Sequence, residues 1–500
     1  MSDELPEGWT SVALTSVLGS QFTGHWGVAP EKAEHAVHVV RNGDISRDST
    51  VRESLPLRGL SSREYEKALL RSGDILVTTS GDLGKTALWP AGAREAAATN
   101  FVRVLRCGAG IEPGYLHYWI RTNRVQAAID FAGRGNAIRN LPSSTWDEIE
   151  VLLAPSAEQR RIVAKVEALL EQVRRAKDRL ERVPLILKRF RQAVLAAACS
   201  GQLTAQWREG HVTRETATEL LVRLDSERKA RWLQRNPKRR VQAPSDVVQE
   251  DLPSIPESWA WTNFDHCAWE ITVGHVGPMK HRYVERGTPF LRSQNVRPLR
   301  FDPANIVFID SDFHAALRKS QLMGGEILVT RSGANTGDCC VYAAASGEAN
   351  CADLVITRPL SGLVPSYGAI YISSPEGQAR IGLRETGMAQ PHFNIKAMRV
   401  KAFPLPPFDE QQEIARRVEV LFTLAAAIEQ RVERAALRAG NIPQAILSKA
   451  FAGELVLTEA ELARAERRDY ETAEQLLARV REAAHEQAPA SLRRGRAVKA

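Results

Sequence analysis

The segment Gly81-Asp-Leu-Gly-Lys-Thr86 has residues of a loop that could hold the phosphates of a nucleotide. Such a loop needs another glycine five residues before the glycine of its Gly-Lys-Thr triplet, and position 79 is threonine. A related segment, 333–338, has Asp338 at the position of the lysine. The sequence therefore does not support nucleotide binding by this element.

Other catalytic patterns are also missing from the sequence. Gly133-Arg-Gly135 begins like a dinucleotide-binding turn, but Ile138 replaces the third glycine. The chain has no Asp/Asn-Pro-Pro-Tyr/Phe methyltransferase motif, no Gly-x-Ser-x-Gly elbow and no His-Glu-x-x-His zinc helix. Its six cysteines form no Cys-x-x-Cys pair, which argues against a disulfide framework or a zinc ribbon. We expect a chain that is not an enzyme and binds no metal or cofactor itself.

An internal duplication determines the architecture. Leu5-Pro-Glu-Gly-Trp9 returns as Ile255-Pro-Glu-Ser-Trp259, and the segment 73–81 returns as 325–333, at an offset of 252 residues. Two similar halves of about 250 residues are therefore expected. Each half begins with turns and β-branched runs, which predict a globular α/β domain, and continues with a helical pattern.

The helical part of each half has apolar residues at alternating steps of four and three, which is the spacing of a coiled coil. The obvious partner of each helix is the other copy in the same chain, although each apolar stripe could instead pack on its own globular domain. Pro184 and Pro443 are expected to break or kink these helices. The predicted contact residues are Ile162, Val166, Leu169, Val173 and Leu180 in the first helix and Ile414, Val418, Leu421, Ile428 and Val432 in the second.

Charge and composition narrow the class of partner. The formal net charge of +8 favours a polyanion, because lysine and arginine release condensed counterions when they neutralise phosphates. The acidic residues near the N-terminus do not fit a secretory signal, and no apolar run approaches the ~20 residues of a membrane helix. We therefore expect a cytoplasmic protein that does not bind membranes.

The order of these features resembles the specificity subunit of Type I restriction-modification systems. The residues that carry the resemblance are Ala154-Pro-Ser-Ala-Glu-Gln159 with Ser200-Gly-Gln-Leu203, and Leu405-Pro-Pro-Phe-Asp-Glu-Gln411 with Ala452-Gly-Glu-Leu455. The resemblance implies two target-recognition domains that read the halves of a split, asymmetric DNA target. It also implies a helical spacer that binds two methyltransferase subunits and, where present, motor-nuclease subunits. S-adenosylmethionine, ATP and magnesium would then be bound by those partners.

The expected fold is mixed α+β, with two tandem recognition domains alternating with two long helical regions that pair as an antiparallel coiled coil, in a pseudo-two-fold repeat. The spacer seam, from Ile162 to Val183, would be about 32 Å long at ~1.5 Å per residue. The expected segments are a first recognition domain at 1–154, helical spacer at 155–208, a solvated linker with a short helix at 209–250, a second recognition domain at 251–406, helical spacer at 407–456 and a helical tail at 457–500.

Base reading requires side chains that can make paired hydrogen bonds, while phosphate contacts require only charge or backbone donors. Residue type alone does not separate these roles. Suitable residues in turn-like stretches of the first half are Arg41, Asn42, Lys85, Arg134, Arg139 and Asn140. Those of the second half are Lys280, His281, Arg292, Gln294, Asn295, Arg331, Asn335, His392 and Asn394.

Two other functions stay open from the sequence. A stand-alone DNA-binding regulator could use the same paired domains. A structural coiled-coil adaptor with protein-binding ends would show no salt-sensitive affinity for DNA.

Overall fold

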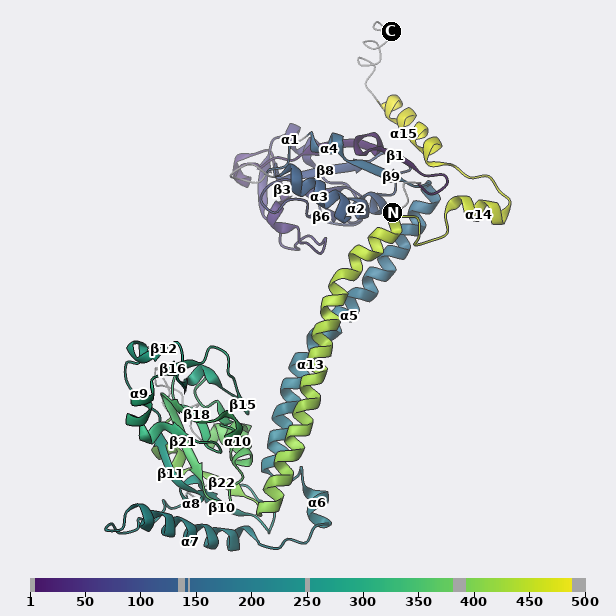
Figure 1. The fold of residues 1–500 in the computed structure, drawn as a ribbon. Helices are drawn as coiled ribbons and strands as arrows, with labels where there is room; N and C mark the ends of the chain where they lie inside the picture. Colours follow the sequence, from purple (N-terminus) through teal and green to yellow (C-terminus); the bar gives the residue numbers. More distant parts are fainter. Residues whose placement is uncertain (1–4, 134–139, 143, 248–251, 381–392, 488–500) are drawn as a thin grey trace. The chain divides into compact units, whose positions relative to one another are not determined.

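The computed structural model describes residues 5–133, 140–142, 144–247, 252–380 and 393–487. It is a mixture of helices and sheets in two compact units. Unit 1 comprises Met1–Glu181 and Arg434–Ala500, and unit 2 comprises Arg182–Glu433. Both long helices are shared between the units, so each unit contains one end of each helix (Figure 1).

Unit 1 is built around a four-stranded antiparallel sheet of order β2-β8-β5-β6 and a three-stranded sheet of order β4-β3-β7. Its strands are β1 Thr10–Ala13, β2 Leu18–Thr23, β3 His35–Val40, β4 Leu57–Leu60, β5 Ile75–Thr78, β6 Thr86–Leu88, β7 Ala96–Ala98, β8 Val102–Cys107 and β9 Glu150–Leu153. Its short helices are α1 Ser62–Ala68, α2 Pro113–Ile120, α3 Asn123–Ala132, α4 Thr145–Glu148, α14 Glu459–Glu466 and α15 Ala473–Gln487.

Unit 2 repeats this plan, with a four-stranded sheet β11-β21-β18-β19 beside a five-stranded sheet β12-β16-β13-β20-β17. Its strands are β10 Ala260–Asn263, β11 Ala268–Val273, β12 Tyr283–Val284, β13 Thr288–Leu291, β14 Val296–Arg297, β15 Arg300–Phe301, β16 Val307–Ile309, β17 Gln321–Leu322, β18 Ile327–Thr330, β19 Cys339–Val341, β20 Ala349–Cys351, β21 Leu354–Pro359 and β22 Ala402–Leu405. Its short helices are α6 Ala205–Glu209, α7 Ala217–Arg235, α8 Phe264–Cys267, α9 Ser311–Ala316, α10 Pro365–Ser373, α11 Pro375–Arg380 and α12 Ile395–Val400.

The two long helices are α5 Ser156–Cys199 and α13 Phe408–Phe451. Each continues through its internal proline, Pro184 or Pro443, so the alternative that these prolines break the helices is wrong, while a kink there stays a prediction. A proline removes one backbone hydrogen bond, and tertiary packing of neighbouring residues can offset this loss; Leu187, three residues after Pro184, is buried.

Helix packing is clear within each unit. In unit 1 the start of α5 shares a core with the end of α13, including Ile162 and Val166 with Ile446 and Leu447. In unit 2 the end of α5 shares a core with the start of α13, including Val194 with Ile414 and Val418. The other residues predicted for this seam, Leu169, Val173, Leu180, Leu421, Ile428 and Val432, are half-buried.

The segment expected to be a solvated linker is partly a structural element of unit 2. Leu220 and Leu224 of α7 are fully buried in its core, and α7 lies beside α8 and β11 (Figure 1). In unit 1 the same position is taken by α15, whose Leu476 and Val480 are buried. The apolar spacing of these helices, rather than their charge, determines their packing.

The Glu-Gln pair at the start of each long helix forms hydrogen bonds with neighbouring segments of the same unit. The buried Glu158 accepts hydrogen bonds from Trp9 Nε1 at 3.0 Å and from the Glu459 backbone N–H at 2.8 Å. Gln159 accepts from the Glu112 backbone N–H at 2.9 Å and donates to the Ala154 carbonyl at 2.8 Å.

In unit 2, Glu410 accepts from Trp259 Nε1 at 2.8 Å, and Gln411 makes equivalent bonds to the backbone of Val364, Gly362 and Pro406. These motif residues therefore have a structural role, because their hydrogen bonds join segments that are distant in sequence.

Candidate nucleic-acid interface

Four loops meet at one edge of the sheets in unit 1. Thr23 at the end of β2 pairs with Arg103 at the start of β8, and Thr78 at the end of β5 pairs with Val102. The parallel strands β3 and β7 end side by side. Loops 24–29, 41–44, 79–85 and 99–101 therefore converge, and we call this set the unit 1 loop edge.

Three of the predicted binding residues are brought together there. Lys85 Nζ donates to the Asn42 carbonyl at 3.0 Å, and Asn42 Nδ2 donates to the Ser80 carbonyl at 3.2 Å. Asn140 forms an isolated β-bridge with Ser80. Arg134 and Arg139, predicted for the same surface, lie outside the described residues.

Arg41 is also at this edge, but its guanidinium is partly engaged within the protein. Its Nε and Nη2 each donate to Asp44 at 3.0 Å. Burial raises the pKa of the Asp44 carboxyl, yet the hydrogen bonds from Arg41 outweigh burial and hold that pKa below its usual value. The ion pair fixes the direction of Arg41, whose side chain remains 42% exposed.

Unit 2 has the same convergence. Val273 pairs with Val355, Thr330 with Leu354, and the parallel strands β13 and β20 end together. Loops 274–279, 292–295, 331–338 and 352–353 therefore meet, and we call this set the unit 2 loop edge. The two edges are equivalent parts of the duplicated plan.

Arg292 occupies the position that Arg41 has in unit 1, at the start of a short turn with a capping residue three positions later. That capping residue is the neutral Asn295 in place of Asp44. Arg292 Nη2 instead donates to the Asn305 carbonyl at 2.7 Å, and Gln294 donates to the same carbonyl at 3.3 Å. The Arg292 guanidinium is therefore not paired with a carboxylate among the residues that the structure describes.

Asn295 itself is fully buried, which corrects its prediction as a DNA-facing residue. Its side chain accepts from the Arg292 backbone N–H and donates to the carbonyls of Asp302 and Ala304. A buried amide with these bonds cannot reach a groove, so its role is to shape the loop.

The remaining predicted residues of unit 2 lie around the same loops. Arg331 pairs with Asp353 at 3.5 Å, and its carbonyl accepts from the Phe393 backbone N–H, which brings Asn394 close to this edge. The Asn394 side chain caps α12 by accepting from the Ala397 backbone N–H at 2.9 Å. Asn335 is half-buried in loop 331–338.

Lys280 and His281 begin the 3₁₀ turn Lys280–Arg282, directly after loop 274–279. His281 is exposed. The side chain of Lys280 and the whole of His392 lie outside the described part of the chain.

The list of predicted residues missed an exposed aromatic pair at the unit 1 loop edge. The rings of Trp26 and Phe101 lie edge to face at 6.1 Å, with 45% and 37% of these residues exposed. The guanidinium of Arg58 lies 5.1 Å from the Trp26 ring centroid. The signal in the sequence is a tryptophan between a histidine and a glycine, His25-Trp-Gly27, where the second half has His275-Val-Gly277.

Within the described ranges, no three His, Cys, Asp or Glu side chains are grouped so that they could hold a metal ion. Among the helices that the structure describes, none combines the length and apolar composition required to cross a bilayer.

No family model matches the chain, but several curated proteins do. The specificity subunit of the Type I restriction enzyme EcoKI, from Escherichia coli (strain K12), is 30% identical over 361 residues, which cover 71% of this chain and 68% of that protein. The EcoBI specificity subunit of Escherichia coli is 31% identical, covering 69% of this chain and 64% of that protein. The StySPI specificity subunit of Salmonella potsdam is 30% identical, covering 71% and 68%.

Solved structures share the fold. The HsdS subunit from Thermoanaerobacter tengcongensis superposes with a TM-score of 0.58 at 20% identity, covering 91% of this chain and 99% of that one. A chain from a structure of type I R-M system assembly and conformational transition gives 0.59 at 20% identity, covering 90% and 99%.

Proposed function

The chain belongs to the family of Type I restriction enzyme specificity subunits, and from this premise we propose that its two loop edges read the two halves of a split, asymmetric DNA target. The observation that carries the proposal is the repetition of one loop edge in both units with different side chains. Where unit 1 has Arg41 with Asp44, unit 2 has Arg292 with Asn295. Where unit 1 has Trp26, unit 2 has Val276. Two readers of the same design with different contact residues suit a target whose halves are unrelated.

The proposed contacts fall into two kinds. Arg292, Gln294 and Arg331 supply donors for base edges or phosphates at the unit 2 edge, as Asn42 and Lys85 do at the unit 1 edge. Trp26 and Phe101 add an apolar surface, which can contact the methyl group of thymine in the major groove.

The helical regions are proposed to pair as an antiparallel coiled coil that separates the two readers and binds two methyltransferase subunits. Exposed apolar side chains on these helices support this role, because apolar patches on helices commonly mark protein interfaces. They are Leu185, Ile186, Val420 and Leu424 in unit 2 and Leu437 and Ile442 in unit 1.

In this proposal the chain is not catalytic and binds no cofactor. S-adenosylmethionine would be bound by the methyltransferase subunits, and ATP with magnesium by motor-nuclease subunits where these are present. Methylation by the assembled complex is then the readout of its specificity.

The test is to purify the chain with the methyltransferase encoded beside it and to map adenine methylation on a plasmid by sequencing. The expected result is a split, asymmetric methylated motif that appears only when both proteins are present. If the chain forms no complex and leaves methylation unchanged, a coiled-coil adaptor or a stand-alone DNA-binding regulator becomes the better explanation.

A further inference from the structure

A basic pocket of about 900 Å³ lies in unit 2, away from its loop edge. It is lined by the residues just before β18 and just after β21, whereas the loop edge is formed by the opposite ends of these strands. A duplex read by the unit 2 loops therefore approaches the other end of the sheet. The pocket requires a different ligand.

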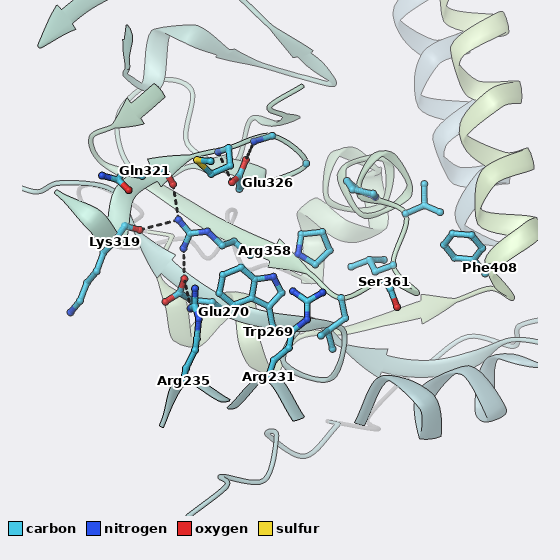
Figure 2. A pocket seen from close by; sticks show the side chains of 18 of the residues that line it. Arg231, Arg235, Trp269, Glu270, Lys319, Gln321, Glu326, Arg358, Ser361 and Phe408 are labelled. Atoms are coloured by element: carbon cyan, nitrogen blue, oxygen red, sulfur yellow. Dashed lines mark hydrogen bonds and ion pairs between the residues drawn. The ribbon is translucent and has the colours of Figure 1, made fainter. Parts of the chain in front are cut away.

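Trp269 forms the centre of this pocket, with three arginines around it (Figure 2). The guanidinium carbons of Arg235, Arg358 and Arg231 lie 4.2, 5.5 and 5.9 Å from its ring centroid. Arg358 is held in place by Glu270 and by the Gln321 carbonyl at 2.7 Å. Arg235 begins the basic run 235–240, so the structure gives part of that run a defined position.

The cations of the pocket outnumber its carboxylates. Five lining residues are basic, namely Arg231, Arg235, Arg318, Lys319 and Arg358, and two are acidic, Glu270 and Glu326. Glu326 is already occupied by the backbone N–H groups of Met323 and Gly324. Among the described residues, neither Arg318 nor Lys319 pairs with a carboxylate, and both are exposed. Arg231 pairs with Glu227, and Glu270 is shared by two other arginines of the lining. Arg318 and Lys319 are therefore the residues through which the pocket can accept negative charge.

Part of the pocket lining is apolar. Met323, Leu360, Val364, Pro365 and Phe408 line it, and Figure 2 shows Phe408 on the side opposite Lys319 and Gln321. A ligand that fills the pocket must carry apolar groups as well as anions. A protein segment with carboxylate and apolar side chains satisfies both requirements, whereas a phosphate backbone satisfies only the first.

The pocket adjoins the helices that are proposed to bind the methyltransferase. Phe408 and Gln412 belong to the first turns of α13, and the exposed Val420 lies eight residues beyond Gln412, about 12 Å along the helix. We propose that this pocket receives an acidic, apolar segment of the methyltransferase subunit. This inference rests on the proposed function for the identity of the partner.

The first half of the chain keeps some of these charges, since Lys67 is the counterpart of Lys319, and lacks others. At the offset of 252 residues, Glu66 stands for Arg318, and Arg106, the counterpart of Arg358, is paired with Asp74 at 2.7 Å. Helices α7 and α15 are equivalent in the two halves, at the slightly larger offset of 256 residues. At this offset the position of Arg231 is occupied by Gln487.

The test uses the complex of the full chain with its methyltransferase. Arg318→Glu/Lys319→Glu should weaken binding of the methyltransferase about tenfold or more at low salt, with a smaller effect at high salt. The matched control, Arg94→Glu/Arg286→Glu, makes the same change of charge on exposed residues that do not line the pocket and should bind as the wild type does. Thermal unfolding of both variants checks that they are folded.

Carbodiimide cross-linking provides a second readout, because it joins the Lys319 amine to a neighbouring carboxylate as an amide. Mass spectrometry should identify a cross-link from Lys319 to an acidic segment of the methyltransferase, and Lys319→Arg should remove it while keeping the affinity. If Arg318→Glu/Lys319→Glu binds the methyltransferase as tightly as the wild type does, the proposal is overturned. It is also overturned if this double variant instead loses affinity for DNA of any sequence, because the pocket would then bind phosphates. A methylation map made with the wild-type chain tests the proposed function separately.

Discussion

At the scale of single residues, Arg292 is the clearest candidate for reading a base. Replacing it with alanine should weaken binding to the half of the target read by unit 2 by about 1–3 kcal/mol, because a bidentate arginine–guanine contact has this value. Methylation mapping and binding assays with duplexes altered in one half would measure the effect. Arg41→Ala is the matched variant and should affect the other half. Equal weakening on unrelated duplexes would instead assign Arg292 to phosphate contact.

His117 gives a second prediction at this scale. Burial in α2 lowers the pKa of its side chain to about 3, while an unfolded histidine titrates near 6.5. Between these two pKa values the unfolded chain binds a proton at His117, whereas the folded chain keeps this side chain neutral. The stability tied to neutral His117 is present above pH ~6.5 and falls as pH drops towards 3, with a loss of about 2 kcal/mol by pH 5.

The variant His117→Ala measures this contribution, since alanine is the residue at the equivalent position 369. The difference between wild-type and variant free energies of unfolding, from urea titrations, should shrink by about 2 kcal/mol between pH 7.5 and pH 5. A difference that stays constant with pH would show that His117 does not titrate in this way.

At the scale of elements, the two Glu-Gln pairs are equivalent in position, but only the glutamate of the second pair accepts a hydrogen bond from an arginine side chain. Glu410 accepts from Arg208 Nη2 at 2.8 Å as well as from Trp259 and from Thr204 Oγ1 at 2.7 Å. Glu158 instead bonds to Trp9 and a backbone N–H, and burial raises the pKa of its carboxyl.

Glu410→Ala should therefore cost more stability than Glu158→Ala. Removing Glu410 leaves the charge of Arg208 partly buried without its partner, at a cost of about 3–5 kcal/mol, whereas the loss of hydrogen bonds to Glu158 costs about 1–3 kcal/mol. Urea unfolding of the two variants gives the comparison. The reverse order would mean that the Arg208 contact contributes little.

The long helices provide a further prediction. Leu169 packs on the core of unit 1, and Leu421 on that of unit 2. In the double variant Leu169→Lys/Leu421→Lys, each lysine charge would lie in an apolar contact, so assembly with the methyltransferase should fall more than the folding of the sheets. Light scattering would measure assembly, and circular dichroism would measure folding.

A suitable control for this variant is Val222→Lys, which places a charge on a 67%-exposed position of α7. It should assemble normally. If assembly and methylation survive the double change, the proposal that paired helices act as a spacer is wrong.

At the scale of the whole molecule, the sequence predicts repeated architecture better than it predicts contacts. Segments such as 73–81 and 325–333 keep their residues because both form a buried central strand, β5 or β18, with the following loop. Periodicity also predicts the long helices, since an apolar stripe of this length has few other uses. The tertiary packing that carries α5 through Pro184 is not visible in the local sequence.

The candidate sites were less predictable, for a physical reason. Asn295 and Gln294 are both polar residues in one turn, yet Asn295 is buried with its hydrogen bonds satisfied and Gln294 is exposed. Residue type gives the capacity to form hydrogen bonds, but the partner depends on chain segments far away in sequence. Trp26 was missed because an exposed tryptophan cannot be told from a core tryptophan by its type.

The presence of two readers on one chain leads to the last prediction. A duplex with both half-targets should bind much more tightly than a duplex with either half alone, because the second contact forms at a high effective concentration. We expect a difference of about 100-fold or more in Kd. Arg292→Ala should reduce binding to the complete target while leaving a duplex that contains only the unit 1 half unaffected. If one half-target binds as tightly as the complete duplex, only one loop edge contacts DNA, and the other unit must have a different role.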